Sequence, residues 1–272
     1  MVFITLIRKQ LRDARWLLGL SVAAFVGLSW LSVFLTTRFE RLAARGELGP
    51  NVRRFGFLRA LGGAAMDYST IALEVCWWNH PFVLLIVLSW AVARGASAVA
   101  GEIERGTLDL TLSRPVSRWT FLGSQVAAGI LGLLALATAL IVGNLLGTRF
   151  NPVKTPPTVL DLLRPATLLV ALGWSIFGYT IAFSAMDSVR WRPGVIGMAI
   201  TLGGLVAMTV APQFDSVKWL ENLSVFQVYA PVTAAVDGEN LAREAGILGL
   251  VGLSGVVIAF GAFARRDLPA AS

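Results

Sequence analysis

Hydrophobic residues along this chain gather in long runs that are separated by short polar segments. Six of these runs are near or above the roughly 20 apolar residues with which a helix crosses the roughly 30 Å hydrocarbon core of a bilayer. They lie at 16–36, 81–100, 119–147, 165–186, 194–211 and 246–264. The strict alternation that is typical of half-buried strands does not occur in them. The pattern therefore predicts an all-α integral membrane protein with six transmembrane helices.

The first fifteen residues have a different pattern, because apolar and basic residues separate onto two sides of a helix. At the helical period, one side holds Phe3, Ile4, Ile7 and Leu11. The other side holds Arg8, Lys9, Arg12 and Arg15. Such a segment is typical of a helix that lies in the membrane interface. The alternative is an ordinary basic flank that frays.

The polar segment between the second and third runs, GEIERGTLDLTLSRPVSR, covers residues 101–118. Its position between two spans makes it a loop at one face of the membrane. Gly106 and Thr107 can end one helix and start another, with Thr107 as N-cap and Asp109 in the first turn, where a negative charge suits the helix dipole. The next proline ends that helix, and Ser117 can cap the following span. We expect a short, stiff surface helix between two long ones.

Residues 102–108 and 113–118 of this segment resemble the first cytoplasmic loop of ABC-2 type transporter permeases. The resemblance is close over 101–118 and loose over the remaining chain. It implies that the short helix is a coupling helix seated in a groove of a separate ATPase subunit, and that the N-terminal segment is an interfacial elbow helix. The residues expected to contact the ATPase are Glu102, Glu104, Gly106, Thr107, Asp109, Arg114 and Arg118. The alternative is a solvated polar turn.

With the N-terminus in the cytoplasm, the inner and outer segments carry equal numbers of Lys and Arg. The inner segments are much shorter, so the density of positive charge favours cytoplasmic N- and C-termini. The predicted parts are an elbow helix at 1–15, a transmembrane domain at 16–264 with outer loops 37–80 and 212–245 and the coupling loop 101–118, and a cytoplasmic tail at 265–272.

The loops carry further expectations. Charges in 37–80 argue against a seventh span, and we expect one or two helices resting on the outer surface there. In 212–245 the apolar residues predict a short amphipathic helix that precedes Pro231. The inner segment 187–193 is either a second ATPase contact or a plain tight turn.

Composition supports a membrane protein. The chain is 56% hydrophobic and 14% charged, with a mean hydropathy of +0.71, whereas soluble domains carry about 25% charged residues. The net charge is +7, but the basic residues flank the spans, so lipid head groups and topology explain them without a nucleic acid. A single cysteine, Cys76, excludes an intrachain disulfide.

Catalytic motifs are absent from the sequence. No GxxxxGK[ST] phosphate loop occurs, so ATP and Mg²⁺ are expected on a partner ATPase and no cofactor on this chain. His80 is the only histidine, and a metal site or catalytic triad needs several converging groups. We therefore expect a non-catalytic subunit with no catalytic or metal-binding residues. No Asp or Glu lies in the six runs, which argues against a proton- or ion-coupled carrier.

A few polar residues within the runs are candidates for a transport pathway: Arg94, Asn144 and Tyr179. Arg94 can snorkel to the cytoplasmic face, pair with Glu102 or Glu104, or line a conduit for an anionic head group. Glycines recur in the last two runs, as in Gly246, Gly249, Gly252 and Gly255. They suit helix packing within one subunit or at a subunit interface.

The resemblance implies an inner-membrane permease subunit of an ATP-driven transporter, in the commoner case an exporter. It would work as two membrane subunits, identical or different, with two ATPases. One alternative is a related membrane subunit that serves assembly of an extracytoplasmic protein. Another, from a different class, is a stand-alone channel or carrier.

Overall fold

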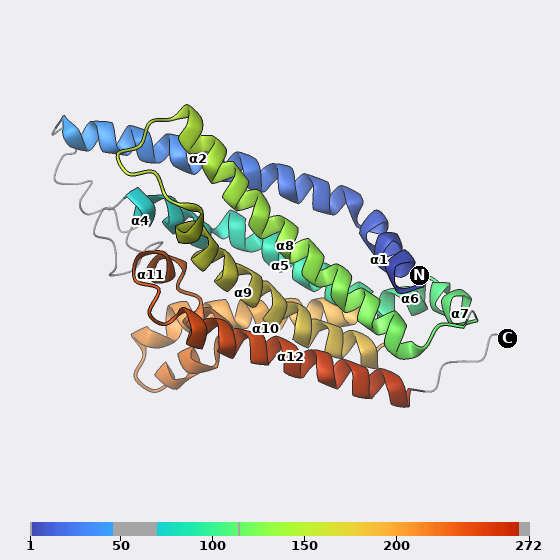
Figure 1. Cartoon of the computed structure of the whole chain (residues 1–272). Helices are drawn as coiled ribbons and strands as arrows, with labels where there is room; N and C mark the ends of the chain where they lie inside the picture. Colours follow the sequence, from blue (N-terminus) through green and yellow to red (C-terminus); the bar gives the residue numbers. More distant parts are fainter. Residues whose placement is uncertain (1, 46–69, 114, 267–272) are drawn as a thin grey trace.

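The computed structural model describes residues 2–45, 70–113 and 115–266. Over these residues the chain is helical, without strands. The longer helices run side by side as an elongated bundle (Figure 1). The α-helices are α1 (Val2–Asp13), α2 (Arg15–Ala44), α4 (Thr70–Val75), α5 (Pro81–Ser97), α6 (Ala100–Glu104), α7 (Thr107–Leu112), α8 (Arg118–Phe150), α9 (Val159–Met186), α10 (Trp191–Val210), α11 (Pro231–Val236) and α12 (Leu241–Arg265). Short 3₁₀ helices are η3 (Cys76–Asn79), η4 (Ala211–Gln213), η5 (Lys218–Leu223) and η6 (Val225–Val228).

Five helical segments of the described chain are each long and apolar enough to cross a membrane: Arg15–Arg41, Arg118–Phe150, Val159–Met186, Trp191–Gln213 and Leu241–Arg265. A sixth candidate is a bent pair, Thr70–Asn79 with Pro81–Ser97, whose two parts meet at 47°. The all-α membrane fold predicted from the apolar runs is therefore confirmed, with five to six candidate spans.

The helix of the second run begins at Pro81, as predicted, but it ends early. It ends at Ser97 instead of continuing to residue 100, and a further helix, α4, precedes it.

Residues 46–69 of the outer loop 37–80 lie outside the described residues. In the described part, Glu74 on α4 is 0% exposed, so this helix does not rest on the surface as the sequence predicts. The six apolar runs contain no carboxylate, but the observed helical segments extend beyond the runs and include Glu40, Asp161 and Glu244, and the bent pair includes Glu74. Asn144 of α8 donates to Glu74 Oε2 at 2.8 Å, and this long-range contact is invisible in local hydropathy.

The fourth span begins before its predicted start at Pro165. Thr158 and Asp161 form a reciprocal capping box that starts α9 at Val159, and this arrangement satisfies backbone donors of the first turn. Pro165 therefore lies inside the helix.

The segment 212–245 does not contain the predicted amphipathic helix. Two 3₁₀ helices, η5 and η6, occur there instead, because Ser224 between them accepts from Phe226 N and donates to Gly204 O of α10. Pro231 begins α11.

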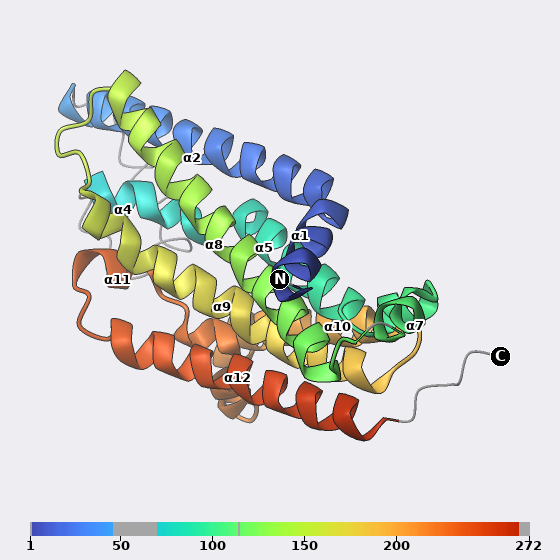
Figure 2. The same ribbon diagram turned by 45° about the vertical axis from the view of Figure 1, so that its right-hand side comes forward.

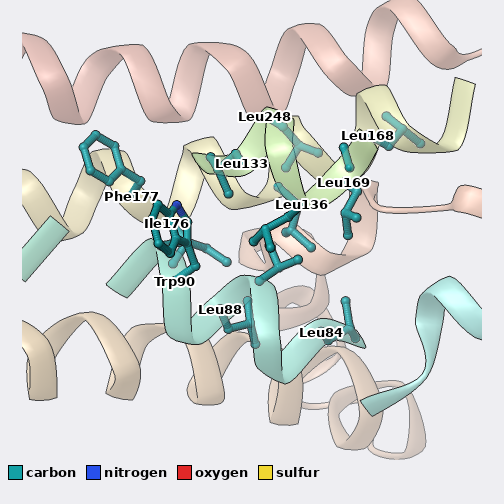
Figure 3. Close-up of a cluster of buried hydrophobic side chains, with 14 of the residues drawn as sticks. Leu84, Leu88, Trp90, Leu133, Leu136, Leu168, Leu169, Ile176, Phe177 and Leu248 are labelled. Carbon is teal, nitrogen blue, oxygen red and sulfur yellow. The ribbon is translucent and has the colours of Figure 1, made fainter. Parts of the chain in front are cut away.

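The buried core lies between α5, α8 and α9 (Figure 3). Trp90 of α5 fits against glycines of α8, and its Nε1 donates to Gly129 O at 3.3 Å. A Cβ on Gly132 would lie 1.9 Å from the Trp90 ring, so the indole needs that glycine. Leu133 and Phe177 close the same cluster from α8 and α9. Because α9 also packs on α10, α11 and α12, it is the central helix of the bundle.

Glycines in the last span pack within the subunit. A Cβ on Gly255 of α12 would lie 2.3 Å from backbone atoms of Gly178 on α9, and one on Gly252 would meet Trp174 at the same distance. Nothing lies within 4 Å of such an atom on Gly246 or Gly249. The α9–α12 contact therefore requires glycine only at Gly252 and Gly255, although Gly249 O also accepts from Trp174 Nε1 at 3.1 Å.

Candidate functional site

The polar segment 101–118 forms a compact structure at one end of the bundle, near the start of α1 and the end of α12 (Figures 1 and 2). Gly106 separates α6 from α7 and has φ 66°, in the left-handed region. The predicted end of one helix and start of another at Gly106 and Thr107 is confirmed, as is Asp109 in the first turn of α7. Ser117 caps α8 by accepting from Thr120 N at 3.0 Å.

Thr107 differs from its predicted role as N-cap. Gly106 occupies the N-cap position, and no side chain caps α7. The Thr107 hydroxyl instead donates to Glu102 Oε2 at 2.6 Å. The reason is the sharp turn at Gly106, which folds α7 back toward the carboxylate of the preceding helix.

The connection between α5 and α6 is a break in the helix, filled by a serine from α9. The backbone N–H groups of Val99 and Ala100 donate to Ser184 Oγ at 3.2 and 3.0 Å. The same hydroxyl donates to Ala96 O at 2.8 Å. All three contacts are buried, so one side chain satisfies the backbone groups that the break leaves open. Nothing in the sequence around 97–100 indicates this partner, which is more than 80 residues away.

Glu102 is the central side chain of the segment, and it is only 1% exposed. Lys9 Nζ of α1 lies 3.1 Å from its Oε2, and Arg105 Nη2 lies 3.0 Å from its Oε1. Together with Thr107, these donors surround both carboxylate oxygens. Glu102 therefore links α1 to α6 and α7 within the chain, and its direct contact with a partner stays a prediction. Lys9, on the basic side of the predicted interfacial helix, is part of this cluster.

The environment of Glu102 acts on its pKa in two directions. Burial by itself would raise the pKa of the carboxyl. The hydrogen bond from Thr107, the charge and hydrogen bond of Lys9 and the charge of Arg105 outweigh that effect, so the pKa lies below its ordinary value of 4.5. Glu102 is thus held as a carboxylate at neutral pH.

Glu104 connects the same segment to α10. Its Oε2 accepts from the backbone N–H of Arg190 at 2.8 Å, and Arg190 is the N-cap of α10. A carboxylate at a helix N-terminus satisfies a free donor and suits the dipole. In the adjoining turn, Asp187 Oδ1 accepts from Ser188 N and Val189 N. The inner segment 187–193 is therefore tied to the polar segment.

Two arginines donate hydrogen bonds to the carbonyl oxygens at the C-terminal ends of α12 and α9. Arg118, at the start of α8, donates from Nη1 to the carbonyl oxygens of Phe263, Ala264 and Arg266, at 3.1, 3.1 and 2.7 Å. Arg266 in turn donates to the carbonyl oxygens of Ala185 and Asp187 at the end of α9. Basic side chains commonly satisfy the last carbonyls of helices in this way. The arrangement joins α8, α12 and α9.

The outward side of α7 is free of such internal contacts. Asp109 and Leu110 are exposed there, and Leu110 is 71% exposed, an unusual position for a leucine in a polar segment. Sequence reasoning did not select Leu110, although an apolar residue inside a charged loop is the signal that could have found it. Arg114 lies outside the described residues.

The three candidate pathway residues lie in separate places. Arg94 is 7% exposed, and its Nη2 donates to Gln10 Oε1 of α1 at 3.4 Å and to Gln125 Oε1 of α8 at 3.1 Å. Asn144 pairs with Glu74, and the Tyr179 hydroxyl pairs with Thr201 of α10.

No hydrogen bond among the described residues joins these three side chains to one another. The alternative in which Arg94 pairs with Glu102 or Glu104 is not what the described ion pairs show. A role of the three residues in transport stays a prediction.

Comparison with known proteins gives one finding. Residues 4–268 match the family model described as ABC-2 family transporter protein. Neither the curated proteins nor the solved structures contain a match to the chain. The family model covers nearly all of the residues, including every described helix apart from the first two residues of α1.

Proposed function

We propose, since this chain belongs to the ABC-2 family of transporter proteins, that it is the permease subunit of an ATP-driven exporter and is energised by a separate ATPase through α7. The family implies association with an ABC ATPase and with the membrane. ATP and Mg²⁺ then bind to that partner, and the hydrolysis takes place there. The observation that carries the proposal is the network of contacts from the polar segment to the helices around it.

The network gives α7 the connections that a force-transmitting element needs. Glu102 links it to α1 through Lys9, and Glu104 links it to α10 through the N–H of Arg190. Ser184 holds the start of α6 against α9. A displacement of α7 would therefore act on several helices at once, because packed elements move as rigid bodies rather than deforming continuously.

The exposed side of α7 is the surface that contacts the ATPase. Asp109 and Leu110 offer one charge and one apolar side chain to a groove of the ATPase. Gly106 is also exposed and sets the angle of α7. The contact between Thr107 and Glu102 then holds α7 from behind. Glu104 and Arg118 act through the neighbouring helices that they join.

The remaining features follow from this assignment. The end of the bundle that carries α7 faces the cytoplasm, together with both termini, and α1 is the elbow helix in the adjacent membrane interface. Two such permease subunits, identical or different, enclose the pathway between them. Closure of two ATP-bound partner subunits moves α7, and α5 and α8 follow it to expose the pathway to alternate sides. This is a coupling between two sites through one two-state element.

The test is co-purification of an ATPase from native membranes with the tagged chain in nanodiscs. We compare wild type with Leu110→Arg, and use Arg265→Ala as the control, because Arg265 is exposed at the same end of the bundle. Loss of a central apolar contact residue is expected to reduce recovery roughly tenfold or more, with the control unchanged. Size exclusion and circular dichroism should be unaltered for Leu110→Arg, since that side chain has no internal role.

Two results would contradict the proposal. Equal recovery of the ATPase with Leu110→Arg would move the contact surface away from α7. Absence of any ATPase with wild type, in every detergent and in nanodiscs, would favour a stand-alone channel or carrier, and a flux assay on the chain alone would follow.

A further inference from the structure

The end of the bundle opposite α7 buries a carboxyl group whose side chain has an incomplete set of hydrogen bonds. Glu74 lies on α4, next to α2 and α11 (Figure 1). Its side chain is 0% exposed, as are Ala72 and Val75 on the same helix. Removing an ionised carboxylate from water without a compensating charge is costly. The protonation state of Glu74 therefore depends on the groups around it.

The one hydrogen-bond partner of Glu74 in the described chain is an amide. Asn144 of α8, also 0% exposed, donates from Nδ2 to Glu74 Oε2 at 2.8 Å. The other oxygens of both groups, Glu74 Oε1 and Asn144 Oδ1, are buried and have no hydrogen-bond partner. Both atoms are acceptors when Glu74 is ionised. The pair thus has two unused acceptors and lacks a donor.

No cation compensates Glu74 among the described residues, whose ion pairs all lie elsewhere. The charged group that acts on it is Glu40 of α2, which has the same sign. Glu40 accepts from Thr70 Oγ1 at the start of α4 and from Lys154 N after α8. The other titratable or charged groups on the surrounding elements are Arg38, Arg41 and Arg45 at the end of α2, Cys76 and His80 beside α4, Arg149 and Lys154 around the end of α8, Asp161 and Arg164 on α9, and Tyr229 and Asp237 flanking α11.

We propose that Glu74 is a proton-binding site, in which the protonated carboxyl and the Asn144 amide form a pair with two hydrogen bonds. A hydronium ion from the solvent transfers its proton to Glu74 Oε1 and leaves a water molecule. The new O–H group supplies the missing donor to Asn144 Oδ1. Asn144 Nδ2 continues to donate to Oε2. The pair then carries no charge, and both of its unused acceptors are accounted for.

The proton connects the packing of α4 to the protonation of Glu74. While α4 lies against its neighbours, the carboxyl is shielded and keeps its proton. A movement that separates α4 from α8 would admit water, and the proton would be released together with the loss of the Asn144 contact. This site is independent of the ATPase contact at the other end of the molecule, so either proposal can fail without the other.

Infrared spectroscopy of the chain in nanodiscs tests the proposal directly. At neutral pH, wild type should show the carbonyl-stretch band of a protonated carboxylic acid, with its characteristic shift in D₂O. Glu74→Gln should abolish that band but still fold, because glutamine offers the same pair of hydrogen bonds to Asn144. Glu239→Gln is the matched control, since Glu239 is an exposed carboxylate after α11, and its spectrum should keep the band.

The contrary results are equally specific. A wild-type spectrum without the band at neutral pH would mean that Glu74 is ionised, with a water or a metal cation meeting the two acceptors, and would overturn the proposal. A band that persists in Glu74→Gln would assign the proton to another carboxyl. If Glu74→Gln does not fold, Asn144→Ala replaces it: the wild-type band should move to the frequency of a carboxylic acid without an amide partner, and an unmoved band would contradict the pair.

Discussion

Both oxygens of the Glu102 carboxylate accept hydrogen bonds inside the chain, from Lys9, Arg105 and Thr107. A residue of this kind acts through the helices that it joins. Its position one helix before α7 makes it a positioning residue, and the exposed Asp109 and Leu110 remain for a partner. Burial gives these ion pairs their effect on stability, because the same carboxylate in exposed ion pairs would contribute little to the free energy of unfolding.

Glu102→Gln should lower stability in a pH-dependent way. The folded pKa of Glu102 lies below 4.5, so the stabilisation by the carboxylate is complete above that value and disappears as the pH falls through the folded pKa. We expect a deficit of about 1–2 kcal/mol at neutral pH, because Lys9 and Arg105 are partly exposed. Thermal unfolding of both proteins in nanodiscs should show the deficit shrinking below pH 4.5. A constant deficit would show that the charge is not its cause.

At the scale of elements, the break between α5 and α6 and the turn between α6 and α7 determine where α7 lies. The break depends on a side chain from a distant helix, Ser184, whereas the turn depends on one local residue, Gly106. These two positions can be tested separately.

Ser184→Ala should destabilise the connection between α5 and α6, because it leaves the N–H groups of Val99 and Ala100 without their acceptor. The expected loss is about 2 kcal/mol, given the cost of unsatisfied buried donors. Ser175→Ala is the control on the same helix: Ser175 is equally buried, but its hydroxyl donates only to Leu172 O within α9. Denaturation midpoints of the two variants would compare them. Equal losses would contradict a special role for Ser184.

Gly106→Ala should loosen α7. The space around Gly106 is open, but its φ of 66° is unfavourable for alanine, at a cost of about 1–2 kcal/mol. Gly106→Asn should stay near wild type, since asparagine tolerates the left-handed region. Hydrogen exchange of the α7 amides would measure the difference, with faster exchange in the alanine variant alone. Similar exchange in both variants would mean that the turn does not need the left-handed conformation.

For the whole molecule, the closest backbone approach described above is that of α9 and α12. It places Gly178 against Gly252 and Gly255, where a Cβ would lie within 2.6 Å of backbone atoms. The bundle is thus held around α9 by contacts that leave no room for a side chain, and α9 also carries Ser184.

Gly255→Ala should therefore separate α9 from α12, with a loss of about 1–3 kcal/mol from overpacking. Gly246→Ala, on the same helix but with nothing within 4 Å of the added Cβ, should be neutral or slightly stabilising, because alanine favours helix. Thermal unfolding in nanodiscs distinguishes the two variants. If Gly246→Ala were the more damaging, that face of α12 would be a contact with a second subunit.

The spans and the short helix α7 could be predicted from the sequence because both depend on local patterns. Long apolar runs marked the membrane helices, and Gly106 and Ser117 marked helix ends. The predicted helix limits were wrong where a side chain outside the apolar run determined where the helix begins or ends. The Thr158–Asp161 box moved the start of α9, and Ser184 ended α5 before residue 100. The burial of Glu74 could not be foreseen, because its partner Asn144 lies 70 residues away.

The sequence by itself determined that the chain crosses a membrane as helices, and that a stiff polar segment with the ABC-2 resemblance lies between two of them. Only the tertiary structure decided which of that segment's residues face inward. Lys9 and Glu102 are 93 positions apart, and hydropathy does not encode which helices lie side by side. In a low-dielectric interior such pairs determine where charges are tolerated, so the packing of the helices assigned the roles of Glu102, Ser184 and Glu74.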